Sequence, residues 1–493
     1  MSKYTPDAFS HYQSASEIEN DLSMQVPSVT LLTSEGPPLT KTTCIRGDHL
    51  CKTSLPTLSH GIAEIRSVAT AKALKCLLES LTRNQAISIG VLKKGTSARI
   101  GRKGRLKGRE ISRTKDHFRF PVGSAWLLWD YDAKSMPPEV ARRVEKLGGP
   151  LEAFYHICPD ARSAAQVVRP SSSDGLYAPG VPLERSAGRH GYFLFQEGTR
   201  IPEALRVLQE RAWEAGLAWF AVSASGAILE RSIVDITVGS PERLIFEAPP
   251  ILIAPVKRAP SPTLVQEGGA MAIPTLTEET RIQAEALKTA ARQAVKPTAK
   301  ATKQRFVEAR TDDHVRCLGV SRRAAGRAVQ ALLQSRALED DSLLELADGR
   351  RVRAGDLLDG KAGHHHMSMP DPVEGIGYGR DKATLFLEPR PGHPDDDPCI
   401  VSHAHGEKVV YRFARFENAA VAPAHPMPPT GDERAPAIAA MRERIAEWGR
   451  LSDQFARAHF ISQVEAAETM HCGALCPGQD ATEAAAGRVE VLQ

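Results

Sequence analysis

The feature that most constrains this chain is an apolar run that ends in two carboxylates. Residues 124–132 read Ser-Ala-Trp-Leu-Leu-Trp-Asp-Tyr-Asp. The run predicts a buried β-strand, and side chains at i and i+2 share one face of a strand, so Asp130 and Asp132 would lie together at its end. Neighbouring carboxylates ionise most easily when a cation lies between them, and a divalent metal is the usual cation. Alone, the pattern is equally typical of a strand that ends in an acidic turn.

The composition indicates a globular protein of two or three domains. The chain has 493 residues, of which 42% are hydrophobic and 25% are charged. No stretch approaches the roughly 18 apolar residues of a transmembrane helix, and the first residues form no apolar signal region. We therefore expect a cytoplasmic protein with no membrane partner. The eight cysteines are scattered, which predicts reduced thiols.

Shifts in composition and periodicity divide the chain into six segments. We predict a mostly disordered N-terminal segment (1–58), an α+β catalytic domain (59–255), a linker and helix (256–310), a winged-helix-like segment (311–360), a small β-rich module (361–416) and a helical C-terminal tail (417–493).

Local patterns predict individual elements. Within 59–255, we expect helices over 61–81, over 137–147 and from Pro202, and strands over 86–92, 125–131, 155–158, 166–169, 188–195 and 219–222. Farther on, Thr275 and Glu278 form a capping box that opens a helix ending before Pro297. Ser321 caps another helix, and residues 343–352 form a hairpin that turns at 348–349.

A cationic loop precedes the Asp-x-Asp strand. Between residues 93 and 115, lysines and arginines are opposed only by Glu110, and four glycines disfavour a regular helix. Such a loop suits a polyanion such as a nucleic-acid backbone or a triphosphate, and the alternative is a solvated loop without a partner. The residues assigned to nucleic-acid binding are Arg102, Lys103, Arg105, Lys107, Arg109 and Arg113.

Two later apolar strands carry further candidate residues, His190 and Asp235. Nucleotidyl transfer needs carboxylates that hold two divalent ions about 4 Å apart, together with groups that bind the triphosphate. The three aspartates could provide the carboxylates, while His190 and its neighbours could bind phosphate. Taken singly, His190 is more typical of a buried core histidine, and Asp235 of a strand-end cap.

Together, the order of these motifs resembles the archaeo-eukaryotic primase superfamily, and in particular the primase-polymerases of phages, plasmids and integrative elements. That family has an Asp-x-Asp pair, a Ser-x-His type element and a late Asp after an apolar residue. The resemblance covers roughly residues 35–255, including 109–114, 186–190 and 231–250.

The resemblance implies an α+β primase-polymerase core with a mixed β-sheet flanked by helices. It further implies a two-metal Mg²⁺ or Mn²⁺ site without an organic cofactor, a single-stranded or primed DNA template, and NTP or dNTP substrates. The implied metal ligands are Asp130, Asp132 and Asp235, and the implied nucleotide-binding residues are His190, Arg189 and Ser186, with Ser172 or Ser173 as the alternative serine.

The later segments carry weaker patterns. Residues 371–379 and 400–406 resemble a module that follows the primase in phage primase-helicases, but the chain has no Gly-x4-Gly-Lys-Ser/Thr motif, so a helicase partner would be a separate chain. We favour structural roles over metal binding for several clusters, which are Asp371, Glu374, His403 and His405, the histidines at 364–366, and His471, Cys472 and Cys476.

The sequence thus predicts a template-directed nucleotidyltransferase, a DNA primase or polymerase, that acts in replication of a mobile genetic element. One alternative is a non-catalytic replication initiator or DNA-binding protein on the same fold. A second is a metal-dependent glycosyltransferase, in which Asp-x-Asp also binds a metal. The second alternative gives no reason for His190, Asp235 or the cationic loop.

Overall fold

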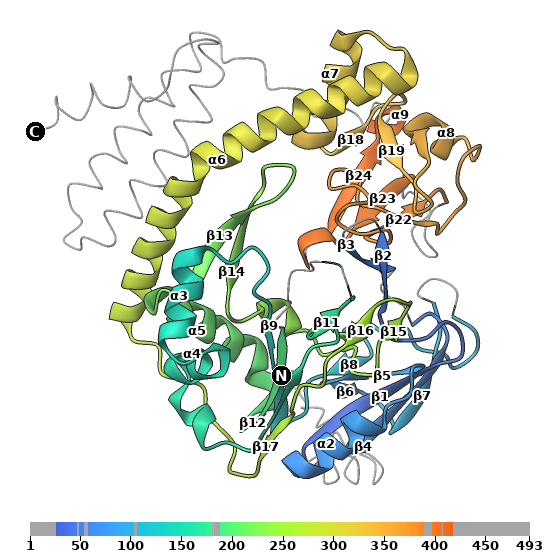
Figure 1. Ribbon diagram of the computed structural model, residues 1–493. Helices are drawn as coiled ribbons and strands as arrows, with labels where there is room; N and C mark the ends of the chain where they lie inside the picture. The colour runs from blue at the N-terminus through green and yellow to red at the C-terminus, as the bar shows by residue number, and fades with distance from the viewer. Residues whose placement is uncertain are drawn as a thin grey trace, which may run out of the picture. The chain divides into compact units, whose positions relative to one another are not determined.

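The computed structural model has a mixed α+β architecture, drawn in Figure 1. It describes residues 26–46, 49–53, 58–102, 106–179, 181, 188–388, 397–406 and 408–417. Nearly all of the predicted C-terminal tail, with Cys472 and Cys476, lies outside these residues. No helix within them has both the length and the apolar character that crossing a bilayer requires.

The first sheet is antiparallel, with the strand order β5-β1-β4-β7. Its strands are β1 (Ser28–Ser34), β4 (Gly61–Ser67), β5 (Gln85–Ser88) and β7 (Ser97–Ile100), and α2 (Ala71–Ser80) follows β4. The helix predicted over 61–81 is therefore wrong for its first half. Ile62, Ile65 and Val68 fit a helical period, but residues 61–67 pair with β1 along their length.

Residues 26–53 also correct the prediction of a mostly disordered N-terminal segment. Besides β1, they contain β2 (Thr42–Arg46) and β3 (His49–Thr53), and β15 (Ile251–Leu252) completes a sheet in the order β15-β2-β3. The polar Ser/Thr-rich composition hid these strands because their partners come from distant parts of the chain. Thr40, for example, donates a hydrogen bond to the Ala248 carbonyl (3.1 Å).

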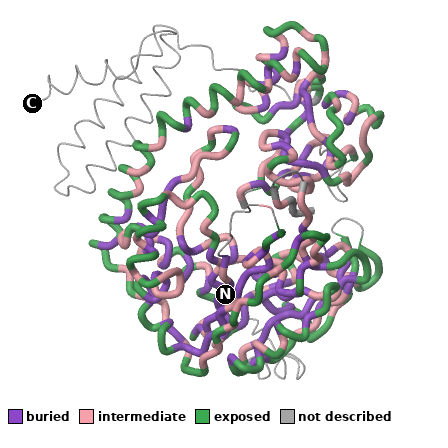
Figure 2. The backbone as a smooth tube through the Cα atoms, in the orientation of Figure 1, coloured by how far each residue is buried: buried purple, intermediate pink, exposed green. Residues whose placement is uncertain are grey.

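The second sheet carries the Asp-x-Asp strand and has the order β17-β10-β12-β9. Its members are β9 (Ala125–Tyr131), β10 (Gln166–Pro170), β12 (Arg189–Phe195) and β17 (Leu264–Gln266). Every pairing is antiparallel, so this sheet is not the mixed sheet that we predicted. Residues 256–275, predicted as a linker, contribute β17 to it. Strands β9, β10 and β12 are mostly buried, whereas the edge strand β17 is partly exposed (Figure 2).

Three helices share a hydrophobic core with the second sheet, and aromatic packing joins one of them to it. The helices are α3 (Pro138–Lys146), α4 (Pro150–Ile157) and α5 (Ile201–Glu214). Phe154 of α4 stacks on Trp129 of β9, with ring centroids 4.8 Å apart, and contacts Phe193 of β12 at 4.7 Å. Residues 155–158, predicted as a strand, are instead the last turn of α4 and its cap, because the helix begins at Pro150 in a favourable first-turn position.

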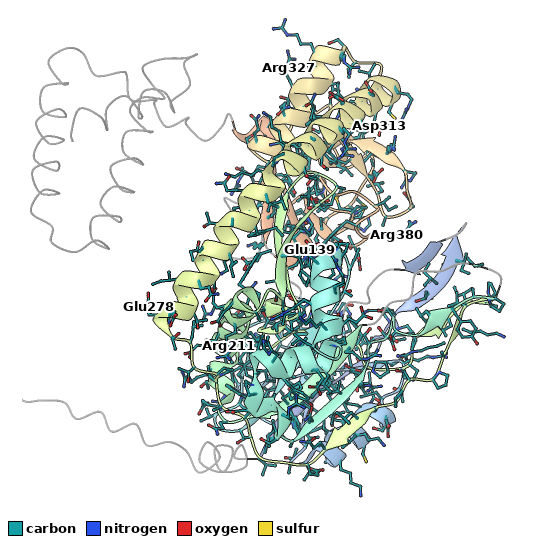
Figure 3. The ribbon with its side chains drawn as sticks, turned by 60° about the vertical axis from the view of Figure 1, so that its left-hand side comes forward. Glu139, Arg211, Glu278, Asp313, Arg327 and Arg380 are labelled. Atoms are coloured by element: carbon teal, nitrogen blue, oxygen red, sulfur yellow. The ribbon has the colours of Figure 1, made fainter. Side chains whose placement is uncertain are left out.

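A long helix, α6 (Glu278–Leu318), follows this region and is seen along its length in Figure 3. It begins after Thr277, whose hydroxyl accepts a hydrogen bond from the Thr280 amide, and it continues through Pro297, so the predicted end before that proline is wrong. The hairpin of β13 (Ala218–Val222) and β14 (Ile228–Ser232) packs on it closely. A Cβ on Gly226 would lie 2.7 Å from the Ala299 carbonyl oxygen.

The remaining described residues form a second core. As predicted, Ser321 caps α7 (Arg322–Gln334), and β19 (Leu343–Glu345) pairs with β20 (Arg351–Arg353) as a hairpin. A five-stranded sheet has the order β18-β24-β23-β22-β21, with β18 parallel to β24. Leu338 and Phe413 share its core, so residues 311–360 and 361–416 pack together.

The other elements of this part are β18 (Ala337–Leu338), α8 (Ala354–Leu358), β21 (Ser368–Met369), β22 (Ala383–Phe386), β23 (Cys399–Ser402), β24 (Val409–Phe413) and α9 (Ala414–Glu417). Nearer the N-terminus, two short pairs complete the description: β6 (Val91–Leu92) with β8 (Phe118–Arg119), and β11 (Leu176–Tyr177) with β16 (Lys257–Arg258).

Candidate functional site

Strand register places Asp130 beside His190. The two residues are direct partners in the antiparallel pairing of β9 and β12, and His190 Nε2 lies 3.6 Å from Asp130 Oδ1. Arg169 of β10 is the partner of His190 on its other side. Arg169, His190 and Asp130 therefore form a row across three neighbouring strands. His190 is the middle residue of this row, and the three strands are largely buried.

Asp235 reaches the same place from an irregular segment after β14. Two bonds attach this segment to β9: Trp129 Nε1 donates to the Ile233 carbonyl (2.7 Å), and the Asp235 amide donates to the Asp130 carbonyl (3.3 Å). The Asp235 carboxylate accepts hydrogen bonds from the amide and hydroxyl of Thr237 (2.8 and 2.9 Å), which open the 3-10 turn Ile236–Val238. The chain thus brings Asp235 next to Asp130, as the sequence pattern requires.

Asp132 lies one position beyond the end of β9 and is exposed. Its Oδ1 accepts a hydrogen bond from the Lys134 amide (3.0 Å). Within the described residues, no three His, Cys, Asp or Glu side chains converge closely enough to enclose a metal ion. Asp130 and Asp235 are neighbours through the backbone hydrogen bond, and the charge of Asp235 acts on the Asp130 carboxyl.

The electrostatics at Asp130 favour a cationic ligand. Burial raises the pKa of the Asp130 carboxyl, and the negative charge of Asp235 raises it further, against opposing effects of His190, Arg243 and Lys41. A cation that contacts both carboxylates would remove this repulsion. Mg²⁺ is commonly held by one or two carboxylates, with water and substrate phosphate oxygens completing its shell, so the donor set fits it.

Two cations near these carboxylates were missed in the sequence. Arg243 Nη2 lies 3.9 Å from Asp235 Oδ2, and Arg243 also donates to the carbonyl and hydroxyl of Thr237 (both 2.7 Å). Lys41 precedes β2 and has no ion pair among the described residues. Burial lowers the pKa of the Lys41 ammonium, although its acidic neighbours Asp130, Glu247 and Asp132 act to raise it. Both side chains are well suited to bind phosphate.

Glu247 is a third residue that the sequence did not reveal. Its buried carboxylate lies behind His190, where Oε1 contacts His190 Nδ1 (2.5 Å) and accepts a hydrogen bond from the Tyr192 hydroxyl (2.6 Å). Oε2 lies 3.2 Å from Arg169 Nε. Burial alone would raise the pKa of Glu247, but His190, Arg169 and the Tyr192 hydrogen bond outweigh it and lower the pKa to about 2.

The same contacts affect His190. Burial lowers the pKa of its imidazole, but Glu247 and Asp130 outweigh burial, so the net pKa is raised above its ordinary value. The structure therefore favours a cationic His190, with Nδ1 directed to Glu247 and Nε2 directed to Asp130.

The predicted nucleotide-binding residues have different positions. Arg189 begins β12, and its guanidinium pairs with Asp174 (2.8 Å). The turn containing Ser172 and Ser173 lies beside it, because the Ser171 amide donates to the Gly188 carbonyl (3.0 Å). The Ser172 hydroxyl is buried and has no hydrogen-bond partner among the described residues, whereas Ser173 Oγ lies 3.2 Å from Ser171 Oγ. Ser186 lies outside the described residues.

The cationic loop is only partly described. Arg102, Lys107 and Arg109 are exposed, while Lys103 and Arg105 lie outside the described residues. Arg113 differs from the free cation that we predicted. It is half-buried and donates to the Glu242 carbonyl, next to the segment that carries Arg243. Its role is therefore to hold that segment in place.

Residues of the later clusters contact one another. Glu374 Oε1 accepts a hydrogen bond from Ser225 (2.7 Å) and lies 3.0 Å from His405 Nε2, while the Asp371 carboxylate accepts the Val373 and Glu374 amides. Asp371 thus stabilises the turn that follows it, and the structural role of the whole cluster stays a prediction.

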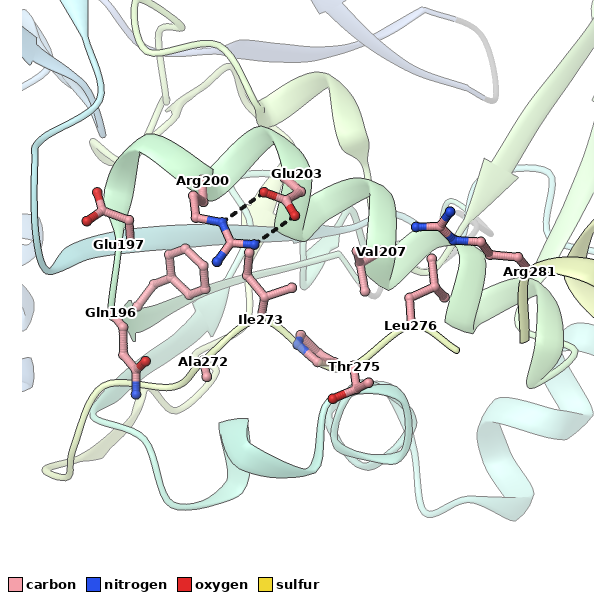
Figure 4. Close-up of a pocket in the computed structure, with 12 residues that line it drawn as sticks. Gln196, Glu197, Arg200, Glu203, Val207, Ala272, Ile273, Thr275, Leu276 and Arg281 are labelled. Atoms are coloured by element: carbon pink, nitrogen blue, oxygen red, sulfur yellow. Dashed lines mark hydrogen bonds and ion pairs between the residues drawn. The ribbon is translucent and has the colours of Figure 1, made fainter. Parts of the chain in front are cut away.

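One surface cavity, of about 360 Å³, lies at the opposite end of β12 from His190, beside the Arg200–Glu203 ion pair (Figure 4). It contains none of the candidate site residues.

Sequence signals explain what was found and what was missed. Asp130, His190 and Asp235 each lie next to an apolar run, whereas Lys41, Arg243 and Glu247 occur in irregular segments with no periodic pattern.

Comparison with family models, with curated proteins and with solved structures gave no match for this chain.

Proposed function

We propose that the chain is a template-directed nucleotidyltransferase, a DNA primase or polymerase that serves the replication of a mobile genetic element. The observation that supports this proposal is the meeting of Asp130, His190 and Asp235 at one end of β9 and β12. The three residues come from segments spread over more than 100 positions, in the order that the primase-polymerase resemblance requires.

The carboxylates and the cations would have separate tasks. Asp130 and Asp235, joined by Asp132 from the strand end, would hold Mg²⁺ or Mn²⁺. The bound metal would activate the attacking hydroxyl and neutralise the leaving pyrophosphate. His190 Nε2, Lys41 and Arg243 would bind the anionic phosphates, because all three lie around Asp130 and Asp235. Ser172, with its unpartnered hydroxyl, and Arg189 would assist from the adjoining turn.

The template would bind through exposed cations. Arg102, Lys107 and Arg109 extend from the loop after β7, and Lys103 and Arg105 belong to the same stretch of sequence. Neutralising DNA phosphates releases counterions, so binding should weaken steeply as salt increases. The α7 helix and the β19–β20 hairpin would add a winged-helix-like contact, and a helicase would be supplied by a separate chain.

The test is incorporation of labelled dNTPs, and separately of NTPs, on single-stranded and primed DNA with Mg²⁺ or Mn²⁺. Asp130→Asn should abolish incorporation while leaving template binding, measured by fluorescence anisotropy, within about twofold. Asp160→Asn, at an exposed aspartate in the turn after α4, is the matched control and should retain activity.

Incorporation by Asp130→Asn would refute the assignment of the site. A wild-type chain that binds template yet never incorporates nucleotide would support the non-catalytic DNA-binding alternative instead.

A further inference from the structure

The contacts of Glu247 divide between its two carboxylate oxygens. Oε1 accepts from the Tyr192 hydroxyl and contacts His190 Nδ1, whereas Oε2 faces Arg169. The Arg169 contact is close in distance, but Arg169 Nε makes no hydrogen bond within the described residues. Within the described residues, the hydrogen bonds of the carboxylate are therefore made by Oε1 with His190 and Tyr192, while Oε2 makes an ion pair with Arg169.

The backbone on both sides fixes the position of Glu247. Two residues before it, Ile245 exchanges backbone hydrogen bonds with Ile87 of β5 (2.8 and 3.2 Å). One residue after it, the Ala248 carbonyl accepts from the Thr40 hydroxyl (3.1 Å). Glu247 is 5% exposed, so solvent competes little with His190 for its carboxylate. Charged hydrogen bonds in such surroundings are strong and directional.

We propose that Glu247 is a positioning residue for His190, because it holds Nδ1 of the imidazole so that Nε2 faces the nucleotide phosphates beside Asp130. This inference rests on the proposed function, in which His190 contacts the nucleotide. The ring has two nitrogens, and the group that binds one of them sets the orientation and tautomer of the other. Glu247 occupies Nδ1, which leaves Nε2 as the nitrogen that faces the carboxylates.

A purely structural role for Glu247 makes different predictions. If Glu247 only neutralised Arg169 or filled the core, its loss would lower stability and leave the affinity for nucleotide unchanged. If Glu247 acts through His190, its loss should weaken nucleotide binding only while His190 is present. This dependence can be measured with a double-mutant cycle.

The experiment uses the full chain with Glu247→Gln, which keeps the shape of the side chain and removes its charge. Tyr192→Phe is the matched control, because it removes the other hydrogen bond to the same oxygen. The readouts are KM and kcat for dNTP incorporation, and the side-chain nitrogen and proton NMR signals of ¹⁵N-labelled histidine, with the His190 signal assigned through His190→Gln.

Glu247→Gln should raise KM at least about tenfold, as expected for the loss of a charged hydrogen bond, with a smaller fall in kcat. Tyr192→Phe should change KM less than about threefold. In the His190→Gln background, Glu247→Gln should change KM less than about twofold. In the wild-type chain, His190 Nδ1 should carry a proton that is hydrogen-bonded to a carboxylate.

An unchanged KM in Glu247→Gln, or an equal rise in both backgrounds, would overturn the inference. A wild-type chain without incorporation would refute the proposed function and not the positioning of His190. In that case, or if Glu247→Gln fails to fold, the NMR signals of the wild-type chain decide. An unprotonated Nδ1 overturns the positioning role, and a hydrogen-bonded Nδ1–H supports it.

Discussion

Acidification should remove a defined part of the stability that Glu247 provides. The pKa of Glu247 is about 2 in the folded chain, against an ordinary value of 4.5. At 1.36 kcal/mol for each pH unit of difference, ionised Glu247 stabilises the fold by about 3 kcal/mol at pH 7. Because the folded pKa is the lower one, this stabilisation is complete above about pH 5 and is lost as the pH falls toward 2. About 1 kcal/mol should be lost by pH 3.5.

The measurement compares wild type with Glu247→Gln in urea unfolding at pH 7 and at pH 3.5. Trp126 and Trp129 share a core with Tyr192, which donates a hydrogen bond to Glu247, so tryptophan fluorescence reports unfolding of this region. The difference in unfolding free energy should be about 3 kcal/mol at pH 7 and smaller by about 1 kcal/mol at pH 3.5. Glu285→Gln, at an exposed position of α6, should differ from wild type by less than about 0.5 kcal/mol at both pH values. A difference for Glu247→Gln that stays constant with pH would refute the reasoning.

Three further predictions concern other parts of the molecule. Lys41→Met should raise KM for nucleotide about tenfold in the incorporation assay while leaving the melting temperature near that of wild type, because the Lys41 ammonium forms no ion pair with any of the residues that the structure describes. An unchanged KM would remove Lys41 from the site. Gly90→Ala should lower the unfolding free energy by at least about 2 kcal/mol in the same urea assay, since its Cβ would lie 2.2 Å from the Pro241 carbonyl oxygen. Gly326→Ala in α7 is the control, because its Cβ would have no atom within 4 Å and the substitution should not destabilise the fold. Cys158 should resist iodoacetamide at pH 8, because burial raises the pKa of its thiol to about 11, while exposed Cys76 is alkylated, as mass spectrometry would reveal.

The strand-borne part of the fold could be predicted from the sequence. The run before Asp130 and the run that contains His190 are apolar enough to be buried on both faces, and both are strands in the structure. Their mutual register could not be predicted, because it depends on a long-range pairing. That pairing places Asp130 opposite His190, and a slip of one residue would move every side chain to the other face.

Predictions failed where local pattern and long-range pairing disagreed. Residues 61–67 have apolar spacing compatible with a helix but form β4 between β1 and β7. Residues 264–266 lie in a proline-rich stretch typical of a linker but form the edge strand β17. Pro297 should end a helix, since it lacks an amide hydrogen, yet α6 continues through it. In each case, contacts distant in sequence outweigh local preference.

The residues that could be predicted and those that could not have different chemical roles. The predicted carboxylates lie at the end of a strand or in a segment that hydrogen-bonds to that strand, and each follows an apolar run that is recognisable in the sequence. The groups that orient them or bind phosphate come from irregular segments: Lys41 precedes β2, and Arg243 and Glu247 follow the turn after Asp235. These segments are held by hydrogen bonds to β5 and to Thr40, and such long-range contacts produce no periodic pattern in the sequence. A search for candidate residues in a chain of this kind should therefore begin at the strand-borne carboxylates and then follow every irregular segment that hydrogen-bonds to their strands or neighbours.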